Sequence, residues 1–262
     1  GSLGDEEDNL RLLVPQAQRK LLLQIAHDDQ LYGGHLGVRK TQKKLKSYWW
    51  PGMTKDVAEY VQTCETCQKF KNERGPKPGK LHPIPVSRLF ERLQIDIIGP
   101  VLTPTQDGNQ YILTGIDAYS RFAYAQPYKD SKTNCCLDFL ESILAIHGCS
   151  ETILTDRGAQ FTSIEWQDRL KKYGIKQRLT SAYHPQCNGM DERLNGSLGK
   201  ILRAYQEKNP SSWDRNIKWA LFAYNTAFHE SLQTTPYEVM FGVQPRTPLN
   251  LPPMRALGDI RS

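Results

Sequence analysis

The chain has few cysteines for its length, no long hydrophobic run and only a small excess of one charge. Six cysteines among 262 residues are too few for a disulfide scaffold, which favours a reducing, intracellular compartment. Since no run of about 18 apolar residues occurs, we expect neither a membrane span nor a membrane partner. The start carries no secretory signal, and we expect residues 1–10 to be a cloning tag followed by a disordered acidic leader.

Charge is nearly balanced overall but unevenly distributed. The whole chain has 34 Lys and Arg against 28 Asp and Glu, whereas residues 11–80 have 14 against 6. A segment this basic is suited to a polyanion such as nucleic acid. A solvated basic surface explains the same excess equally well, so charge alone does not decide.

Proline and glycine divide the chain into two parts. Residues 73–86 contain four prolines and two glycines, a composition that cannot hold a helix and predicts a linker. Before it, apolar residues recur at helical spacing, as in residues 57–64, with Thr54 placed to cap that helix. We therefore expect a small all-helical domain over residues 11–72.

After the linker the pattern changes to strands and helices. We expect strands at 93–99, 152–155 and 176–179, two more within 110–127, and helices at 133–147, 163–173, 190–208 and 212–229. Three strands followed by alternating helices and strands indicate an α/β domain with a mixed sheet over residues 87–243. Residues 244–262 contain four prolines and no periodicity, which is typical of a tail.

Two histidines and two cysteines have the spacing of a metal site. His27, His35, Cys64 and Cys67 follow the pattern H-x7-H-x28-C-x2-C. Two imidazoles and two thiolates make a closed tetrahedral zinc site of the structural kind. A lone Cys-x-x-Cys is as well explained by a redox pair or two buried thiols, but two upstream histidines favour zinc. Because the segment is short, the metal would supply much of its folding energy.

Three carboxylates predict a second metal site. Asp96 lies among apolar residues of a strand, where an unpaired carboxylate is costly, and Asp156 follows another strand. Glu192 lies in the first turn of a helix, off its apolar stripe and on the face of Asn195, whereas Asp191 lies nearer the stripe. Such carboxylates can hold two Mg²⁺ or Mn²⁺ ions about 3.5–4 Å apart, one activating water or a 3′-hydroxyl and the other stabilising the leaving oxygen.

A turn is the competing explanation for each aspartate beside a strand. Asp and Gly commonly follow strands, so Asp156-Arg157-Gly158 also fits a turn. The two further carboxylates at matching places favour a metal ligand for Asp156. Asp117 is another carboxylate in the sheet, but its "DAYSR" setting fits a turn better than a metal site.

Several motifs occur in order along the chain: first "YGGHLGVRKTQKKLKSYWWPGMTKDVAEYVQTCETCQKFK", then "DIIGP", "DAYSRF", "LTDRGAQF" and "SAYHPQCNGMDERLN". They resemble the integrases of gypsy-type LTR retrotransposons and, more distantly, retroviral integrases. The first is similar to the family's amino-terminal zinc domain, and the others are similar to successive blocks of its RNase H-like catalytic core. The match runs from about residue 13 to 248, and the order and gaps of the motifs make it specific.

The resemblance implies an α/β RNase H-like core with a mixed sheet, preceded by a small HHCC zinc-binding domain. It implies zinc on the two histidines and two cysteines, and Mg²⁺ or Mn²⁺ on Asp96, Asp156 and Glu192. The implied activity is attack by a 3′-hydroxyl that joins element DNA ends to target DNA. The implied partners are double-stranded DNA and further copies of the chain, as a dimer or tetramer, and we expect a nuclear location.

A set of eight residues is predicted to contact DNA: Lys40, Lys43, Lys44, Arg157, His184, Asn195, Gly196 and Gly199. For His184, fixing a loop is an equally good explanation. Gly196 and Gly199 lie where related enzymes carry basic or bulkier residues, and each weakens a helix by about 1 kcal/mol relative to Ala. Either the DNA backbone approaches closely at these glycines, or contacts with DNA have been lost there.

Three functions remain open from the sequence: a DNA-strand-transferring recombinase, a hydrolytic RNase H-like nuclease, and a non-enzymatic DNA- or chromatin-binding protein derived from an integrase. The zinc pattern favours the recombinase over the nuclease. Retention of all three carboxylates favours an enzyme over a domesticated copy. The family's carboxy-terminal module, an SH3-like fold or a chromodomain, is not found among these residues. The two histidines are also wider apart than in retroviral integrases, though similar to the gypsy-type spacing.

Overall fold

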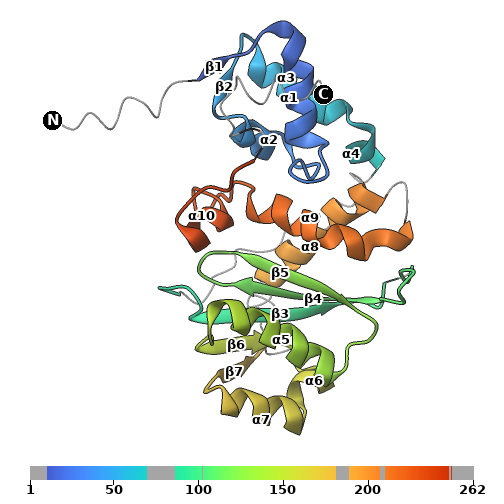
Figure 1. Ribbon diagram of the computed structural model, residues 1–262, viewed down its shortest axis with the longest axis vertical. Coiled ribbons are helices and arrows are strands. Elements are labelled where there is room, and N and C mark those ends of the chain that lie inside the picture. Colours follow the sequence, from blue (N-terminus) through green and yellow to red (C-terminus); the bar gives the residue numbers. More distant parts are fainter. Residues whose placement is uncertain are drawn as a thin grey trace, which may run out of the picture.

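The computed structural model arranges the chain in layers (Figure 1). It describes residues 11–69, 86–101, 103–180, 189–206, 210–247 and 249, with the backbone alone for 189–193, 205, 206 and 210. The amino-terminal helices lie at one end, three later helices form the middle, and a sheet with its remaining helices forms the other end. The predicted leader, nearly all of the linker and most of the tail lie outside the described residues.

The amino-terminal domain consists of short helices around one small core. Its elements are α1 (Gln16–His27), α2 (Val38–Lys44), α3 (Met53–Thr63), α4 (Glu65–Lys69) and two paired two-residue strands, β1 (Leu12–Leu13) and β2 (Tyr48–Trp49). Leu45, Trp50 and Val57 are almost completely buried in that core. The helical domain was predicted, whereas β1 and β2 are too short to show any alternation.

The predicted cap of α3 is wrong. The helix begins at Met53, and its N-cap is Gly52, whose φ of 81° is left-handed. Thr54 therefore lies inside the first turn, where its backbone is already helical and it cannot act as the N-cap. The turn through Gly52 sets the start of α3, and a left-handed glycine ahead of a helix gives a weaker signal than a cap hydroxyl.

The core domain contains a five-stranded sheet in the order β5-β4-β3-β6-β7. Its strands are β3 (Arg92–Ile98), β4 (Tyr111–Asp117), β5 (Ala123–Tyr128), β6 (Thr152–Thr155) and β7 (Lys176–Leu179). Strand β3 pairs antiparallel with β4 and parallel with β6, so the predicted mixed sheet is confirmed.

Helices cover both faces of this sheet (Figure 1). One face carries α5 (Thr133–His147), α6 (Ala159–Thr162) and α7 (Ile164–Lys172); the other carries α8 (Gly189–Gln206), the short 3-10 helix Pro210–Ser212 and α9 (Trp213–Asn225), followed by α10 (Pro236–Phe241). Along β3, Ile95 and Ile97 pack with α5, whereas Ile98 packs with α8 and α9. Since neighbouring strand residues point to opposite faces, Asp96 shares the α8 face with Ile98. None of the helices that the structure describes is both long and apolar enough to cross a membrane.

The amino-terminal domain rests on α9 rather than on the sheet. Leu36 joins the hydrophobic cluster of α8 and α9, and the ring of Tyr32 lies 6.4 Å from that of Phe222. The predicted tail also returns to this domain, because the Tyr48 hydroxyl donates to the Leu249 carbonyl oxygen at 3.0 Å. The two domains therefore share a junction built from the loop before α2, α9 and the end of the described chain.

Candidate metal centres

Two histidines and two cysteines converge in the amino-terminal domain. The ligand atoms of His27, His35, Cys64 and Cys67 all lie within 4.8 Å of one another. The Cys67 Sγ lies 3.3 Å from the His27 Nε2, and the Cys64 Sγ lies 3.5 Å from the His35 Nδ1. Zinc bonds of about 2.3 Å to sulfur and about 2.0 Å to nitrogen place tetrahedral neighbours roughly 3.5 Å apart. The four residues therefore form a site that fits a closed tetrahedral zinc ion.

A glycine turn brings His35 back beside His27. The His35 backbone N–H donates to the His27 carbonyl oxygen at 2.9 Å. A Cβ on Gly33 would lie 2.5 Å from that same oxygen, so only glycine fits. Gly34 and His35 both have left-handed φ values, 69° and 48°, which glycine adopts freely and histidine only with strain. The sequence Gly-Gly-His is thus what closes the first half of the site.

The cysteines come from the end of α3 and the helix after it. Cys64 is the C-cap of α3, and the Gln68 N–H donates to its carbonyl oxygen at 3.0 Å, which turns Cys67 of α4 toward the same point. Burial and then the charge of His35 lower the pKa of His27 to about 4. The neutral imidazole that results is the form that binds a metal.

The register of the sheet sets Asp96 beside Asp156. Strands β3 and β6 are parallel neighbours, with Gln94 opposite Leu154. Two residues further along both strands, the same register places Asp96 opposite Asp156. Neighbouring strands lie about 4.7–4.9 Å apart, and residues in register point to the same face. Extended in this way, the register places the two carboxylates on the α8 side of the sheet, with Asp96 inside β3 and Asp156 directly after β6.

Helix α8 is attached to this point by an amide. The Asn195 Nδ2 donates to the Asp96 Oδ2 at 2.7 Å, and the Thr114 hydroxyl lies 3.2 Å from the Asn195 Oδ1. Glu192 lies one turn before Asn195 in α8; its side chain and that of Asp191 lie outside the described residues. In the structure the Asn195 amide holds α8 against the Asp96 carboxylate. Contact of Asn195 with DNA stays a prediction.

The turn explanations for the aspartates have different outcomes. Asp156 accepts a hydrogen bond through its Oδ1 from the Gly158 N–H at 2.8 Å, so it stabilises the turn after β6. Its side chain is nevertheless exposed, which leaves it accessible to a ligand. Asp117 is fully buried and accepts from the Phe90 N–H and from the N–H and hydroxyl of Ser120. The turn interpretation of Asp117 is confirmed.

Comparison with protein families tests the predicted fold. Residues 14–73 match the model of the integrase zinc binding domain, and residues 87–185 match that of the integrase core domain. The chain therefore contains an integrase zinc binding domain followed by an integrase core domain. The Tf2-3 and Tf2-4 transposon polyproteins of Schizosaccharomyces pombe are each 33% identical over 212 residues, 79% of this chain. This integrase chain spans 16% of the length of those curated relatives.

A solved structure has the same fold. It is a chain of the simian T-cell lymphotropic virus intasome, determined by cryo-EM in complex with the PP2A regulatory subunit B56 gamma. The TM-score is 0.55 at 22% identity, over 84% of this chain and 73% of that one. The prediction of a helical HHCC domain followed by an integrase catalytic core fold is confirmed.

The lysines of α2 lie in three different environments. Lys43 is exposed, and its ammonium lies 4.7 Å from the centre of the Phe228 ring. Lys40 is half-buried, and burial lowers its pKa. Lys44 is buried, and its amine donates to the carbonyl oxygens of Tyr32 and Gly33.

Lys44, which was predicted to contact DNA, does not lie on the exposed surface of α2. In α2 its spacing from Thr41 is one helical turn, and both residues lie on the buried face of the integrase zinc domain. Burial, followed by the charge of Lys40, lowers the pKa of Lys44 to about 7. The basic composition of α2 gives no indication that the side chain of Lys44 is buried.

The remaining predicted DNA contacts lie around the integrase core. Arg157 is exposed, with its Nε donating to the Thr180 carbonyl oxygen at 3.3 Å. A Cβ added to Gly196 would meet no described atom within 4 Å, and one on Gly199 would meet an Arg203 nitrogen at 3.9 Å. The described chain thus supplies no packing reason for either glycine. His184 lies outside the described residues.

Sequence reasoning missed two partners of the metal centres. One is the contact of Asn195 with Asp96; the available signal was its position three residues after Glu192. The other is the Tyr60 hydroxyl, which donates to the Asp28 carboxylate beside the zinc histidines. Tyr60 follows Val57 at helical spacing, and that pattern gives no sign of a polar contact.

Proposed function

We propose that this chain carries out integration chemistry: it processes the 3′ ends of element DNA and transfers them into target DNA. Asp96, Asp156 and Glu192 would hold two Mg²⁺ or Mn²⁺ ions for both steps. The observation that carries the proposal is the parallel register of β3 and β6, which brings Asp96 and Asp156 to the same end of the sheet, with α8 attached to Asp96 through Asn195. Carboxylate oxygens are the ligands that such hard cations prefer.

The chemistry requires little more of the protein than positioning. When bound, the metal ions would activate the attacking oxygen and stabilise the leaving one. Asp96 and Asp156 are aimed by the sheet, which is rigid because both of its faces are packed. Asn195 donates to one oxygen of Asp96 and so fixes the rotation of that carboxylate. We assign Asn195 as a positioning residue for the metal ligands.

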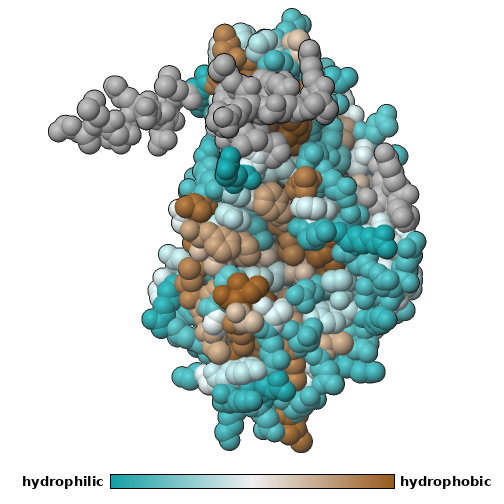
Figure 2. Space-filling model, in the orientation of Figure 1, coloured by the Kyte–Doolittle hydropathy of each residue, from teal (hydrophilic) through white to brown (hydrophobic). Residues whose placement is uncertain are grey.

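The partners in this proposal are double-stranded DNA and further copies of the chain. The proposed location is the nucleus, because the target DNA is there. The solved relative is a chain of an intasome, which supports a multimer on DNA. Apolar residues also gather in the middle of the face drawn in Figure 2. A cavity of about 370 Å³ lies between edge strand β5, α5 and α9, beside Ile146, which is 74% exposed. Exposed apolar surface of this kind is typical of a protein interface.

Strand transfer can be tested directly. Oligonucleotides carrying candidate element ends are incubated with the chain and Mg²⁺ or Mn²⁺, and joined products are sought by denaturing electrophoresis. We expect joined products with the wild type and none with Asp156→Asn. The matched control is Asp168→Asn, an exposed carboxylate of α7. Cutting without any joining would favour the hydrolytic nuclease, and binding without cutting would favour the non-enzymatic alternative.

A further inference from the structure

The loop between the two zinc histidines also contacts the core. The Gln30 amide donates to the Asn216 Oδ1 of α9 at 2.6 Å, and Leu36 is buried with residues of α8 and α9. Beside it, Arg39 of α2 forms a 3.1 Å ion pair with Glu230. One junction thus holds the loop between the zinc histidines, and α2 after it, against the core. This junction encloses a space that neither domain forms alone.

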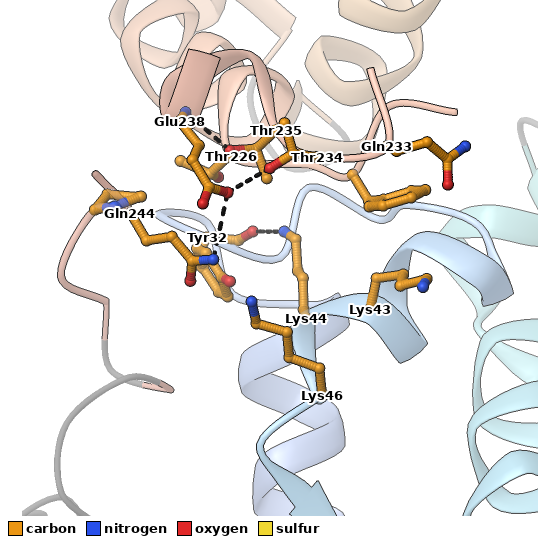
Figure 3. Close-up of a pocket in the computed structure, with 12 residues that line it drawn as sticks. Tyr32, Lys43, Lys44, Lys46, Thr226, Gln233, Thr234, Thr235, Glu238 and Gln244 are labelled. Atoms are coloured by element: carbon orange, nitrogen blue, oxygen red, sulfur yellow. Dashed lines mark hydrogen bonds between the residues drawn. The ribbon is translucent and has the colours of Figure 1, made fainter. Parts of the chain in front are cut away.

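A cavity of about 240 Å³ lies in this junction (Figure 3). Lysines Lys43, Lys44 and Lys46 line it from the amino-terminal domain, and threonines Thr226, Thr234 and Thr235 line it from the core. This volume is below the range of about 300–1,000 Å³ that holds a drug-sized ligand. The space is therefore suited to a small group.

The lining is rich in cationic donors. The Lys44 amine uses two of its three N–H donors on carbonyl oxygens, so one remains. Lys43 lies over an aromatic ring. Among the described residues the side-chain ammonium of Lys46 makes no hydrogen bond or ion pair, although its backbone N–H donates to the Lys43 carbonyl oxygen. Figure 3 shows Lys44 and Lys46 extending from α2 and its end toward Tyr32, on the side that faces the core.

The one carboxylate in the lining is already engaged. Glu238 accepts hydrogen bonds from the Thr234 hydroxyl and, at 3.3 Å, from the Gln244 amide. Lys43 and Lys46 alone outnumber this carboxylate, which leaves an excess of positive charge in a partly enclosed space, where charges interact more strongly than in water. Burial also holds the pKa of Lys44 near 7, and an anion placed next to it would favour its charged form.

We propose that this junction cavity binds one phosphate group of a DNA backbone. Lysine, threonine, glutamine and tyrosine are among the side chains that contact DNA phosphates, and the lining is composed mainly of them. A phosphate held between Lys46 and the segment from Thr226 to Thr235 would tie the zinc domain to the core. The proposal rests on the proposed function only for the source of the phosphate, which is the DNA that an integrase binds.

The first experiment titrates the full chain with inorganic phosphate. Two-dimensional amide spectra are recorded, with sodium chloride of matched ionic strength as the reference. We expect saturable shifts confined to residues 43–46 and 233–235, and their loss in Lys46→Gln. The control Lys55→Gln removes an exposed charge of α3 outside the cavity and should keep the shifts. Shifts equal to those in sodium chloride would overturn the proposal.

The second experiment asks whether the phosphate belongs to DNA. Affinity for a labelled duplex is measured by anisotropy over a series of salt concentrations. Loss of one phosphate contact lowers the slope of log affinity against log salt by about one. We expect this for Lys46→Gln, whose side chain is exposed, and no such change for Lys55→Gln. Equal slopes for the two variants would overturn the assignment to DNA.

The same measurements separate this proposal from the proposed function. They are repeated in the Asp156→Asn background, in which cutting is expected to be lost. A slope difference that persists there, together with a wild type that forms no joined product, would leave the cavity proposal standing while integration fails. Joined products together with equal slopes for the two variants would support integration and overturn the cavity proposal.

Discussion

The two metal centres of this chain are assembled in opposite ways. The zinc ligands form two pairs: a glycine turn brings His35 beside His27, and the end of α3 brings Cys67 beside Cys64, so each pair is assembled locally. Asp96 and Asp156 belong to different strands, and only the parallel pairing of β3 with β6 brings them to the same end of the sheet. One site is a product of local turns, and the other is a product of topology.

The difference extends to what each metal does for the fold. Around the zinc site a single small cluster of apolar residues is buried, whereas the carboxylates lie on a sheet packed on both faces. A small core leaves much of the folding energy to the metal. A large core can hold carboxylates together without one. Zinc should therefore be needed for structure, and Mg²⁺ or Mn²⁺ for chemistry alone.

The largest expected effect is loss of the zinc domain. We predict about one tightly held zinc per chain and unfolding of residues 14–69 in Cys64→Ser, because structural zinc contributes on the order of 10 kcal/mol in small domains. Hydrogen exchange should show α1 and α3 unprotected while β3 and β4 stay protected. Cys149→Ser, an exposed free cysteine, is the control. A well-folded sample that contains no metal by elemental analysis would contradict this.

The next effect is on catalysis without loss of fold. We predict that Asp96→Asn, Asp156→Asn and Glu192→Gln each abolish strand cutting. Without metal their melting temperatures should equal or exceed that of the wild type, because removing one carboxylate relieves repulsion with its neighbours. Cutting assays and thermal scans test both halves. Wild-type activity in any of the three would remove that residue from the site.

A smaller effect is expected for the residue that attaches α8. We predict that Asn195→Ala lowers the cutting rate about 10–100-fold, the usual cost of losing a partner of a metal ligand. The apparent affinity for Mn²⁺ should fall in parallel, which a purely structural role would not require. Thermal stability should change little, since Asn195 is half-buried. An unchanged Mn²⁺ dependence would refute the positioning role.

The smallest effect concerns the glycines of α8. Gly196→Ala should raise the free energy of unfolding by about 1 kcal/mol, since the added methyl group meets no described atom. DNA affinity then distinguishes the two explanations for the glycine. A fall in affinity means that DNA backbone approaches closely here. An unchanged affinity means that this turn of α8 makes no close DNA contact.

Much of the fold could be predicted because its elements carry long periodic patterns. Helix α5 and strands β6 and β7 have the predicted ends. The pair β1 and β2 and the cap of α3 were missed, since two-residue strands carry no alternation and a left-handed glycine is a weak signal. Tertiary contacts decide such features rather than local propensity.

The sites divide along the same line. Zinc ligands could be predicted because ligand type and spacing are both local properties. The contact between Asn195 and Asp96 could not, because it depends on where α8 crosses β3. For Lys44 the charge was given more weight than its position one turn from buried Thr41, and the position was decisive.

The loop from His27 to His35 is at once a metal loop and a docking surface. Gln30 of this loop and Asn216 of α9 are 186 positions apart and joined by one hydrogen bond. Asn216 is buried whereas Gln30 is exposed, so loss of the Gln30 amide would leave a buried amide oxygen without this partner, which is costly. Across related sequences we therefore expect these two positions to vary together, and the inter-histidine loop to evolve with α9 rather than with the rest of its own domain.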